Sequence, residues 1–332
     1  MDPISQAFAG ASFSQSLTRI KTGQQSAFIA GAMSGMAADL DVLIRSEHDP
    51  LLFLEYHRQL THSLVFIPLG ALICAAPLYL FLRNRAGFGE LYLYCLLGYA
   101  SHGLLDACTS YGTQLFWPFS DMRIAWDIIS IIDPLFTLPV MFLVIAGVMT
   151  SRQFFPRAAL VYGLLYLSFG QFQHDRAMDA LASLAKQRGH TATNATVKPT
   201  LANLFLWKLI YEHDGRYYID AARIGIKRSY FEGDSVSSEI DLQAIPTSPL
   251  QLRDIERFRW FSTGYIARYA DDPLLIGDIR YSFLPNTIKP LWGIRLKPRS
   301  PDEHVDYVTT REMNGHIQQQ FYSMLFGRLP AP

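Results

Sequence analysis

The sequence predicts a mainly α-helical fold: a polytopic membrane helix bundle of about five spans, followed by a smaller β-rich extramembrane domain. Half of the 332 residues are hydrophobic and only 17% are charged, below the roughly 25% of soluble chains. The apolar residues gather in residues 25–173, whereas the rest of the chain is ordinary and polar. The formal net charge is zero, so nothing global indicates a nucleic-acid partner.

Composition divides the chain into predicted segments. Residues 1–26 are rich in Ser, Gln and Thr and lack the basic start and apolar core of a signal peptide, so we expect a mobile polar leader. Residues 27–173 form the predicted membrane-embedded domain, and residues 174–192 have the pattern of an amphipathic linking helix. Residues 193–332 form the predicted β-rich extramembrane domain with a C-terminal helix.

The clearest predicted span is residues 63–82, about twenty residues without a charge, which is the length that crosses the hydrocarbon core of a bilayer. Residues 91–109 are similar in length but carry ionisable side chains. Residues 128–149 are also long and apolar, although an Asp-Pro pair interrupts them. We expect each of these runs to cross the membrane.

Two weaker runs flank these three. Residues 27–44 contain Gly31-Ala32-Met33-Ser34-Gly35, a small-xxx-small pattern that allows close helix contact in lipid. This run is only moderately apolar, so we expect other helices rather than lipid to surround it. Residues 158–172 make a shorter last span.

Basic residues predict the orientation of the bundle. Those that fall at one face, if each span crosses once, are Arg19, Lys21, Arg83, Arg85, Arg152 and Arg157. An excess of positive charge marks the cytoplasmic side of a membrane protein. The N-terminus is therefore expected in the cytoplasm, and everything after residue 174 on the opposite, outer side.

Strand signals dominate the chain after residue 193. Residues 204–219 are typical of a β-hairpin with Asp214-Gly215 as its turn. Further strands are predicted at residues 265–269, 276–283 and 291–296. Prolines punctuate the region, and residues 303–326 are expected to finish the chain as a helix.

Acids and imidazoles gather where the predicted spans meet the outer face. The candidate metal ligands are Asp39, Asp41, His57, His62, His102, Asp106 and Asp133. At ~1.5 Å per residue, His102 and Asp106 lie ~17 and ~23 Å into their span, toward its outer end. Ionisable residues in a membrane span are costly and usually functional. The sequence therefore predicts a metal site at this face.

Each pair of candidates has a simpler alternative. His102 and Asp106 are four residues apart and share one helix face, but they could form only a buried hydrogen bond. Asp133 precedes Pro134, and proline suits the first helical position, so Asp133 could be only a helix cap.

The pairs Asp39/Asp41 and His57/His62 also have simpler alternatives that involve no metal. Asp39 and Asp41 could be solvated charges at a helix end, because residues two apart do not share a regular helical face. His57 and His62 could belong to an interfacial polar cap beside the run at 63–82.

The ligand types indicate a divalent transition metal, because mixed nitrogen and oxygen donors suit zinc, manganese or iron better than calcium. We expect zinc or manganese. The candidates exceed one four-coordinate site, so the sequence allows either two ions or one ion with supporting partners. The candidate catalytic residues are Asp41, Arg58 and Asp133. An Asp or His that is not a ligand would transfer the proton, and Arg58, like Arg123, could pair with a substrate phosphate.

Several short motifs occur in a distinctive order. They are Asp39-Leu40-Asp41, His57-Arg58 through Thr61-His62-Ser63, Ser101-His102 through Leu105-Asp106, Thr109-Ser110-Tyr111-Gly112 and Ile132-Asp133-Pro134. They closely resemble the YdjM-type family of inner-membrane, LexA-regulated, metal-dependent hydrolases, over about residues 25–175. Ala38 departs from the family pattern, in which proline is common there. The resemblance implies a bacterial inner-membrane protein with these Asp and His residues as metal ligands, and it supplies no substrate.

These observations predict a membrane-bound metal-dependent hydrolase. Metal-activated water would attack an ester or phosphoester of an amphiphilic substrate at the outer membrane–water interface, with the C-terminal domain in the periplasm. The expected partners are the lipid bilayer and a lipid or other amphiphilic substrate; for the C-terminal domain no protein partner can be named. Two alternatives stay open: a metal-ion or proton transporter, and a structural membrane anchor that presents a partner-binding β domain.

Overall fold

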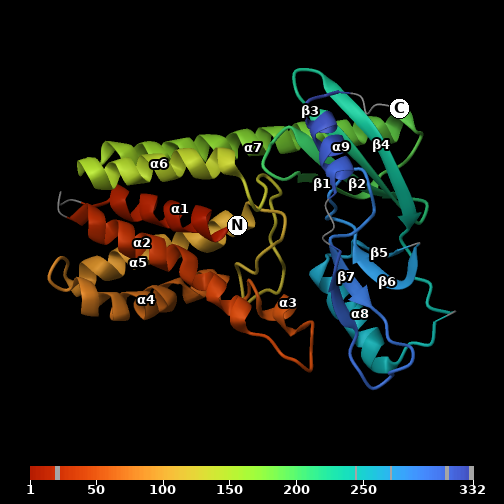
Figure 1. Ribbon diagram of the computed structural model, residues 1–332, viewed down its shortest axis with the longest axis horizontal. Helices are drawn as coiled ribbons and strands as arrows, with labels where there is room; N and C mark the ends of the chain where they lie inside the picture. Colours follow the sequence, from red (N-terminus) through yellow and green to blue (C-terminus); the bar gives the residue numbers. More distant parts are fainter. Residues whose placement is uncertain (19–22, 244, 270, 311–313, 329–332) are drawn as a thin grey trace. The chain divides into compact units, whose positions relative to one another are not determined.

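The computed structural model describes residues 1–18, 23–243, 245–269, 271–310 and 314–328 (Figure 1). The chain splits into two compact units. The first comprises Met1–Ile44, Tyr56–Phe172 and Leu201–Asn203, and the second comprises Arg45–Glu55, Gln173–Thr200 and Leu204–Pro332. Arg19 and Lys21, which were used to predict the orientation, lie outside the described residues.

The first unit is a helix bundle. Its helices are α1 (Pro3–Ser16), α2 (Gln24–Ala37), α4 (Ile67–Leu82), α5 (Phe88–Ala107), α6 (Pro134–Thr150) and the first part of α7 (Phe154–Gln187). Short 3-10 turns lie between them, namely η2 (Ala38–Leu43), η3 (Leu60–His62) and η4 (Leu64–Phe66). The helices run side by side in Figure 1, and α2 packs against α1, α4 and α5.

Residues 3–16 form a buried helix of the bundle, so the expectation of a mobile leader is wrong. Asp2 caps α1 by accepting a hydrogen bond from the Ser5 N–H, and Pro3 stands in the first turn. The serines that look polar in the sequence bond back to their own helix, as Ser12 Oγ does to the Ala9 carbonyl at 2.8 Å. Satisfied in this way, α1 can be buried although its composition is polar.

Small residues allow α1 and α2 to approach closely. A Cβ atom added at Gly10 would lie 2.4 Å from the Gly31 carbonyl oxygen, and one added at Gly31 would lie 2.6 Å from the Gly10 oxygen. Any larger side chain at either position would force the helices apart. The pattern at Gly31–Gly35 therefore serves helix contact, as predicted, although the partner is the segment that was expected to be mobile.

Among the residues that the structure describes, two stretches are long and apolar enough to cross a membrane: Gln24–Leu43, with a mean hydropathy of 1.2, and Leu64–Leu82, with 2.3. Pro134–Thr150 is apolar but shorter, because Asp133-Pro134 begins it. The prediction of about five spans is thus not confirmed. The physical reason is composition, since the remaining long helices of the bundle carry ionisable or polar side chains among their apolar ones.

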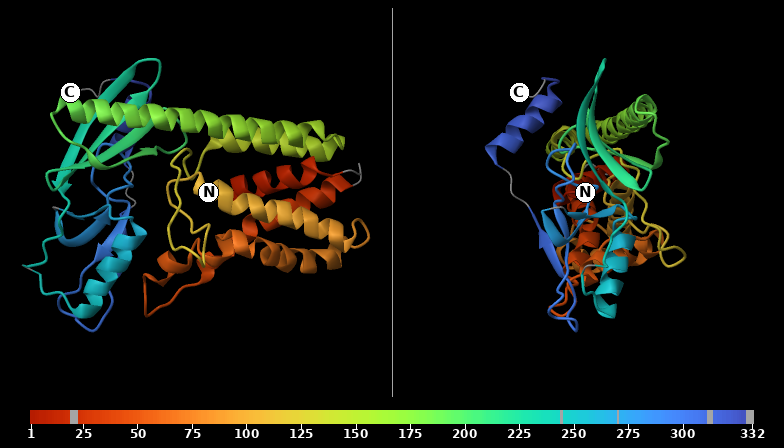
Figure 2. Two further views of the ribbon diagram at one scale, coloured as in Figure 1. Left: turned by 180° about the vertical axis from the view of Figure 1, so that it is seen from behind. Right: turned by 90° about the vertical axis from the view of Figure 1, so that its right-hand side faces the viewer.

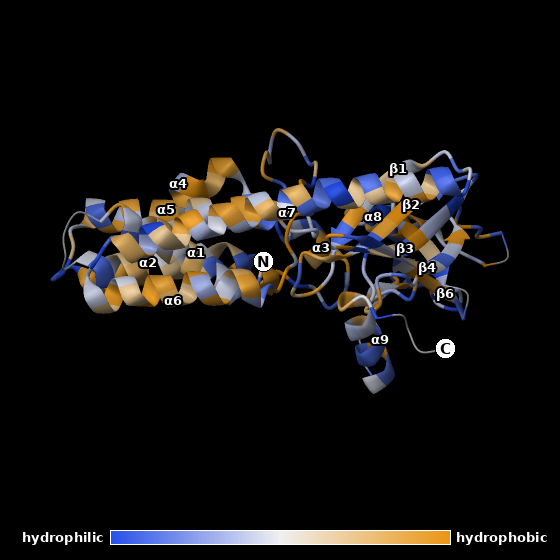
Figure 3. Cartoon of the chain, turned by 90° about the horizontal axis from the view of Figure 1, so that it is seen from above, coloured by the Kyte–Doolittle hydropathy of each residue, from blue (hydrophilic) through white to orange (hydrophobic). Residues whose placement is uncertain are grey.

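Many large apolar side chains of the bundle are exposed, as they would be in lipid. Phe81 on α4, Met149 on α6 and Leu165 on α7 have exposed fractions of 81%, 80% and 65%. Figure 3 shows the apolar colour along these helices. Soluble monomers seldom expose apolar surface of this extent, so the bundle has the surface of a membrane protein.

The second unit contains two four-stranded antiparallel sheets (Figure 2). The first has the order β1 (Thr193–Pro199), β2 (Leu206–His213), β3 (Arg216–Ile224) and β4 (Arg228–Ser237). The second has the order β5 (Ile266–Tyr269), β6 (Asp272–Asp278), β7 (Trp292–Arg295) and β8 (Asp306–Thr309). The helices α3 (Leu52–Tyr56), α8 (Pro249–Phe261) and α9 (Gly315–Leu325) complete the described elements.

The predicted hairpin is confirmed. Strands β2 and β3 pair up to His213 and Arg216 around Asp214 and Gly215, both of which have positive φ, as a type I′ turn requires. The strands predicted at 265–269 and 291–296 agree with β5 and β7, whereas β6 lies earlier than the predicted 276–283. The sequence interpretation missed β1, β4 and α8. The helix expected at residues 303–326 is confirmed only at its end, by α9, because β8 lies in its first part.

Strand β2 of the first sheet is buried on both faces. Trp207 and Leu209 pack with Leu181 of α7, whereas Ile210 packs with Ala267 of the second sheet. This two-sided burial explains why residues 206–211 of β2 are all buried, without the alternation of a half-exposed strand.

Candidate metal centre

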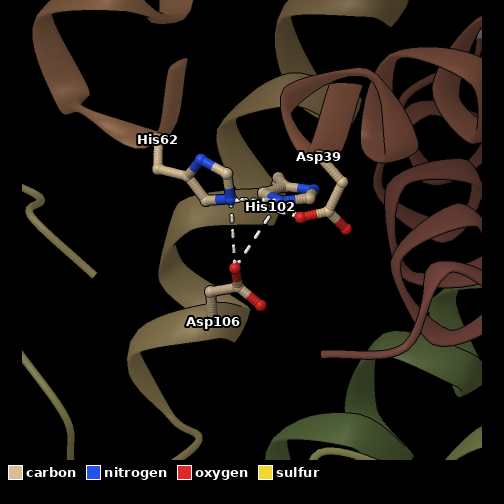
Figure 4. Close-up of side chains that lie close together, drawn as sticks. All are labelled: Asp39, His62, His102 and Asp106. Atoms are coloured by element: carbon tan, nitrogen blue, oxygen red, sulfur yellow. Dashed lines mark hydrogen bonds and ion pairs between the residues drawn. The ribbon is translucent and has the colours of Figure 1, made fainter. Parts of the chain in front are cut away.

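Four of the predicted ligands converge in the first unit: Asp39, His62, His102 and Asp106. Each offers one donor atom, and these atoms all lie within 4.8 Å of one another (Figure 4). His62, His102 and Asp106 are buried, whereas the Asp39 side chain is 21% exposed. The group is therefore nearly dry, and its accessible side is at Asp39.

Three segments of the chain supply this group. Asp39 lies in η2, which directly continues α2, and His62 ends η3 just before the α4 segment. His102 and Asp106 lie one turn apart on α5, so both project from the same helix face. Helical spacing thus provides half of the group, and the ends of two other elements complete it.

The donor atoms are spaced as metal ligands are. His62 Nε2 lies 2.9 Å from His102 Nε2 and 3.2 Å from Asp106 Oδ2. Asp39 Oδ1 lies 3.4 Å from His62 Nε2 and 3.5 Å from His102 Nε2, and the distance from His102 Nε2 to Asp106 Oδ2 is 3.6 Å. Ligands bound at ~2.05 Å to a tetrahedral zinc ion stand about 3.3 Å apart. The four atoms therefore fit around one ion.

The ring of His102 is fixed in the orientation that a metal ligand needs. Its Nδ1 lies 2.5 Å from the carbonyl oxygen of Gly35. Because a carbonyl oxygen can only accept, Nδ1 carries the proton. The neutral ring then presents a lone pair on Nε2, the nitrogen that faces the group.

Asp41 contacts His62 on the side of the imidazole ring that faces away from the group. Its Oδ1 lies 2.6 Å from His57 Nδ1, and its Oδ2 accepts from the Arg58 backbone N–H at 3.0 Å and the Thr61 hydroxyl at 2.7 Å. The same Oδ2 lies 3.2 Å from His62 Nδ1, the nitrogen opposite the one that faces the group. A carboxylate in this position orients a ligating histidine and raises its basicity.

The two oxygens of Asp106 have different surroundings. Oδ1 accepts hydrogen bonds from Gln6 Nε2 at 2.9 Å and from the amino group of Met1. Oδ2 has ion-pair contacts at 3.2 Å with both Arg58 Nε and His62 Nε2, but neither contact nor any other among the described residues has the geometry of a hydrogen bond. A buried charged oxygen is costly unless it is paired and hydrogen-bonded or coordinates a metal. This oxygen is what a site built for a metal ion would present.

Positive charge lies next to the group. Arg58 is buried in a left-handed conformation, with φ of 65°, and its guanidinium stands 4.8 Å from the centre of the Tyr111 ring. Arg123 approaches the same ring at 5.8 Å. Guanidinium groups at this position are suited to an anionic substrate.

The pKa values of His62 and His57 are shifted in opposite directions from the ordinary value of a histidine. Burial lowers the pKa of His62, but its contacts with three carboxylates, Asp106 foremost, outweigh burial and raise that pKa to about 10. Burial lowers the pKa of His57 below its ordinary value despite the hydrogen bond with Asp41. The carboxylates around His62 thus favour a positive charge at the group, whereas His57 favours its neutral form.

The remaining candidates take other places. Asp41 and His57 border the group as a hydrogen-bonded pair. Asp133 is the N-cap of α6, where it accepts from the Leu135 and Phe136 N–H groups and from the Tyr166 hydroxyl at 2.8 Å. The structure therefore does not bring Asp133 into the group, and the alternative of a helix cap describes its position.

Sequence reasoning missed Gln6, which is fully buried and bonded to Asp106. It was overlooked because residues 1–26 were interpreted as a leader. The signal was present, since Asp2-Pro3 is an N-cap followed by proline at the first helical position.

Comparison with known proteins places the first unit in a family. The chain matches the family described as YdjM inner membrane protein over residues 1–177, more than half of its length. It is 33% identical over 106 residues to "Uncharacterized protein YfhP" of Bacillus subtilis (strain 168), which is 32% of this chain and 32% of that protein. The chain thus spans about a third of the length of this relative. No solved structure matches. The chain belongs to the YdjM family of inner-membrane proteins.

Proposed function

We propose that this protein is a membrane-bound metal-dependent hydrolase whose metal centre is Asp39, His62, His102 and Asp106. The observation that carries the proposal is the spacing of their donor atoms, 2.9 Å at the closest pair of nitrogens and 3.6 Å along α5. Imidazole and carboxylate donors favour zinc or manganese.

The substrate proposed is an ester or phosphoester of an amphiphile. Asp39 lies near the end of the candidate span Gln24–Leu43, and His62 directly precedes the candidate span Leu64–Leu82. The ends of spans lie at the depth of lipid headgroups. Arg58 and Arg123 add the positive charge that a phosphate would need.

A bound divalent metal would activate a water molecule and polarise the oxygen of the scissile group. Water and substrate would reach the centre from the side of Asp39, its accessible member. His57 is suited to move the proton, because its side chain is 17% exposed and Asp41 holds its Nδ1 at 2.6 Å. A neutral imidazole oriented by a carboxylate is the usual arrangement of a general base.

Two observations weigh against the alternatives. A transporter would carry ionisable groups along the crossing, but His102 and Asp106 both lie in the last turns of α5. A purely structural polar network would be satisfied within itself, but Asp106 Oδ2 is left without a hydrogen bond among the described residues.

The test is the metal content of detergent-purified protein, with wild type beside the double variant His62→Ala plus Asp106→Ala. His48→Ala serves as a control, because His48 is exposed and lies outside the group. We expect about one equivalent of zinc or manganese in wild type and control, lost in the double variant. The variants that keep the metal should hydrolyse lipid phosphoesters, and the variant that loses the metal should not. A wild type that stays empty after incubation with both metals would remove the proposal.

The proposed topology puts both the second unit and the N-terminus on the periplasmic side, unlike the cytoplasmic N-terminus expected from the sequence, because the amino group of Met1 lies beside Asp106 in the metal group. It is supported by Arg83 and Arg85, which directly follow α4 at the end opposite His62. A reporter that is active only in the periplasm, fused after residue 187 at the end of α7, should be active. Activity of a cytoplasmic reporter at the same position would reverse the orientation.

A further inference from the structure

An apolar groove opens between α2, α4 and α5 within the first unit. Its volume is about 720 Å³, in the range of sites for small organic ligands. Side chains that line it include Ile29, Met33, Met36, Ile73, Cys74 and Pro77. Met33 and Ile73 are more than half exposed, so the groove is open along one side.

One end of this groove is lined by residues next in the chain to members of the candidate metal centre. Leu40, which lines the groove, stands in the chain between Asp39 and Asp41. Thr61 lines it as well, and its hydroxyl donates to Asp41 Oδ2 at 2.7 Å. A molecule lying in the groove would therefore have its end beside Asp41 and beside the chain segment that carries Asp39.

The polar atoms at the end of the groove near Thr61 already form hydrogen bonds within the protein. The hydroxyl of Tyr99 donates to the Thr61 carbonyl at 2.9 Å, and both residues line the groove. Tyr99 packs where α4 has Gly70, since a Cβ atom there would lie 2.4 Å from the Tyr99 ring. With these groups paired, the remaining lining side chains offer almost only apolar contact to a ligand.

We propose that the groove holds one hydrocarbon chain of the substrate, so that the ester or phosphoester at the head of that chain lies at the metal centre. This inference rests on the proposed function and names its substrate class: a lipid bearing at least one acyl chain. The groove lies against both candidate spans, Gln24–Leu43 and Leu64–Leu82, where the surrounding medium is hydrocarbon. Methionines such as Met33 adapt to irregular apolar ligands.

In a membrane such a groove contributes orientation as well as affinity. The chain passes from lipid into surroundings that are equally apolar, so its affinity comes from packing contacts with the lining rather than from transfer free energy. Confining the chain to one direction places its head beside the catalytic groups, which raises the rate through proximity. Substrates without a long chain should therefore be turned over slowly even when they carry the same ester.

The test fills the groove with a larger side chain. Ile73→Trp places an indole in it, and Met33→Trp does the same from α2. Leu72→Trp is the matched control, because Leu72 directly precedes Ile73 in α4, is 43% exposed and does not line the groove. Melting temperatures in detergent establish which variants fold, and either groove variant suffices.

Binding is measured on metal-depleted protein by native mass spectrometry with a phospholipid and its lyso form. We expect one lipid per chain in wild type and in Leu72→Trp, and a loss of roughly tenfold or more in the groove variants, as overpacking of a filled site predicts. Equal binding in all variants, or equal loss in all, would overturn the groove as the site. A dimer that only the groove variants disrupt would also overturn it, since a second copy would then fill the groove.

Metal content is measured separately on the same preparations. If wild type holds metal but the groove variants bind lipid as wild type does, the acyl-chain site fails and the hydrolase proposal stands. If only the groove variants lose lipid binding but wild type binds no metal, the lipid site stands and the hydrolase proposal fails.

Discussion

Replacing Asp41 by asparagine tests how the centre is supported. Asparagine keeps the size of the side chain but turns one oxygen into a donor, which faces the donors of His57 or of Thr61. It also removes the negative charge that stands 3.2 Å from His62 Nδ1. Loss of a partner behind a metal ligand typically weakens metal affinity about 10–100-fold, or ~1.4–2.7 kcal/mol.

The assay is a competition between detergent-purified protein and a chromophoric chelator for zinc or manganese. Asp175→Asn is the control, because that side chain is 66% exposed, and it should bind metal as wild type does. Asp106→Asn, which alters a donor of the group itself, should lose more affinity than Asp41→Asn. Wild-type affinity in Asp41→Asn would refute the supporting role, and a loss as complete as that of Asp106→Asn would make Asp41 a ligand.

Further variants test other contacts. His57→Gln should keep the metal and lose roughly 10²-fold or more in hydrolysis rate, and metal loss would contradict this role. Gln6→Ala removes a 2.9 Å hydrogen bond to Asp106 and should weaken metal binding about tenfold. Gly10→Val should lower the melting temperature, since overpacking costs about 1–3 kcal/mol or more; unchanged melting would refute the close contact of α1 and α2. Burial lowers the pKa of Lys208 to about 7. Because the unfolded chain keeps this proton up to about pH 10.5, the second unit should gain stability with rising pH between these values, on the order of 1 kcal/mol per pH unit. In denaturant titrations at several pH values, Lys208→Met should reduce the dependence of the unfolding free energy on pH. An unchanged dependence would mean that another group causes it.

Local rules were enough wherever neighbouring residues set the structure. The spacing of His102 and Asp106 places both on one face of α5 because a helix repeats every ~3.6 residues. The run that became Leu64–Leu82 has the length of a span whatever surrounds it. Asp214-Gly215 accommodates positive φ, which a two-residue hairpin demands. The family resemblance was likewise visible in short motifs of the sequence, and the family match over residues 1–177 confirms it.

Tertiary structure decided what local rules leave open. Asp39 and Asp41 both follow α2, and only the path of η2 turns Asp39 toward the histidines and Asp41 behind them. Asp133 has the sequence signals of both a ligand and a cap, and its place at α6 shows the cap.

The sequence by itself indicated the membrane character of the first unit, the hairpin of the second and all four members of the candidate metal group, because these depend on composition and on short motifs. Only the tertiary structure decided that α1 is packed in the bundle and that Gln6 supports Asp106. The physical reason is that burial of Ser- and Gln-rich helices depends on partners far along the chain, which satisfy their polar groups. No local pattern contains that information.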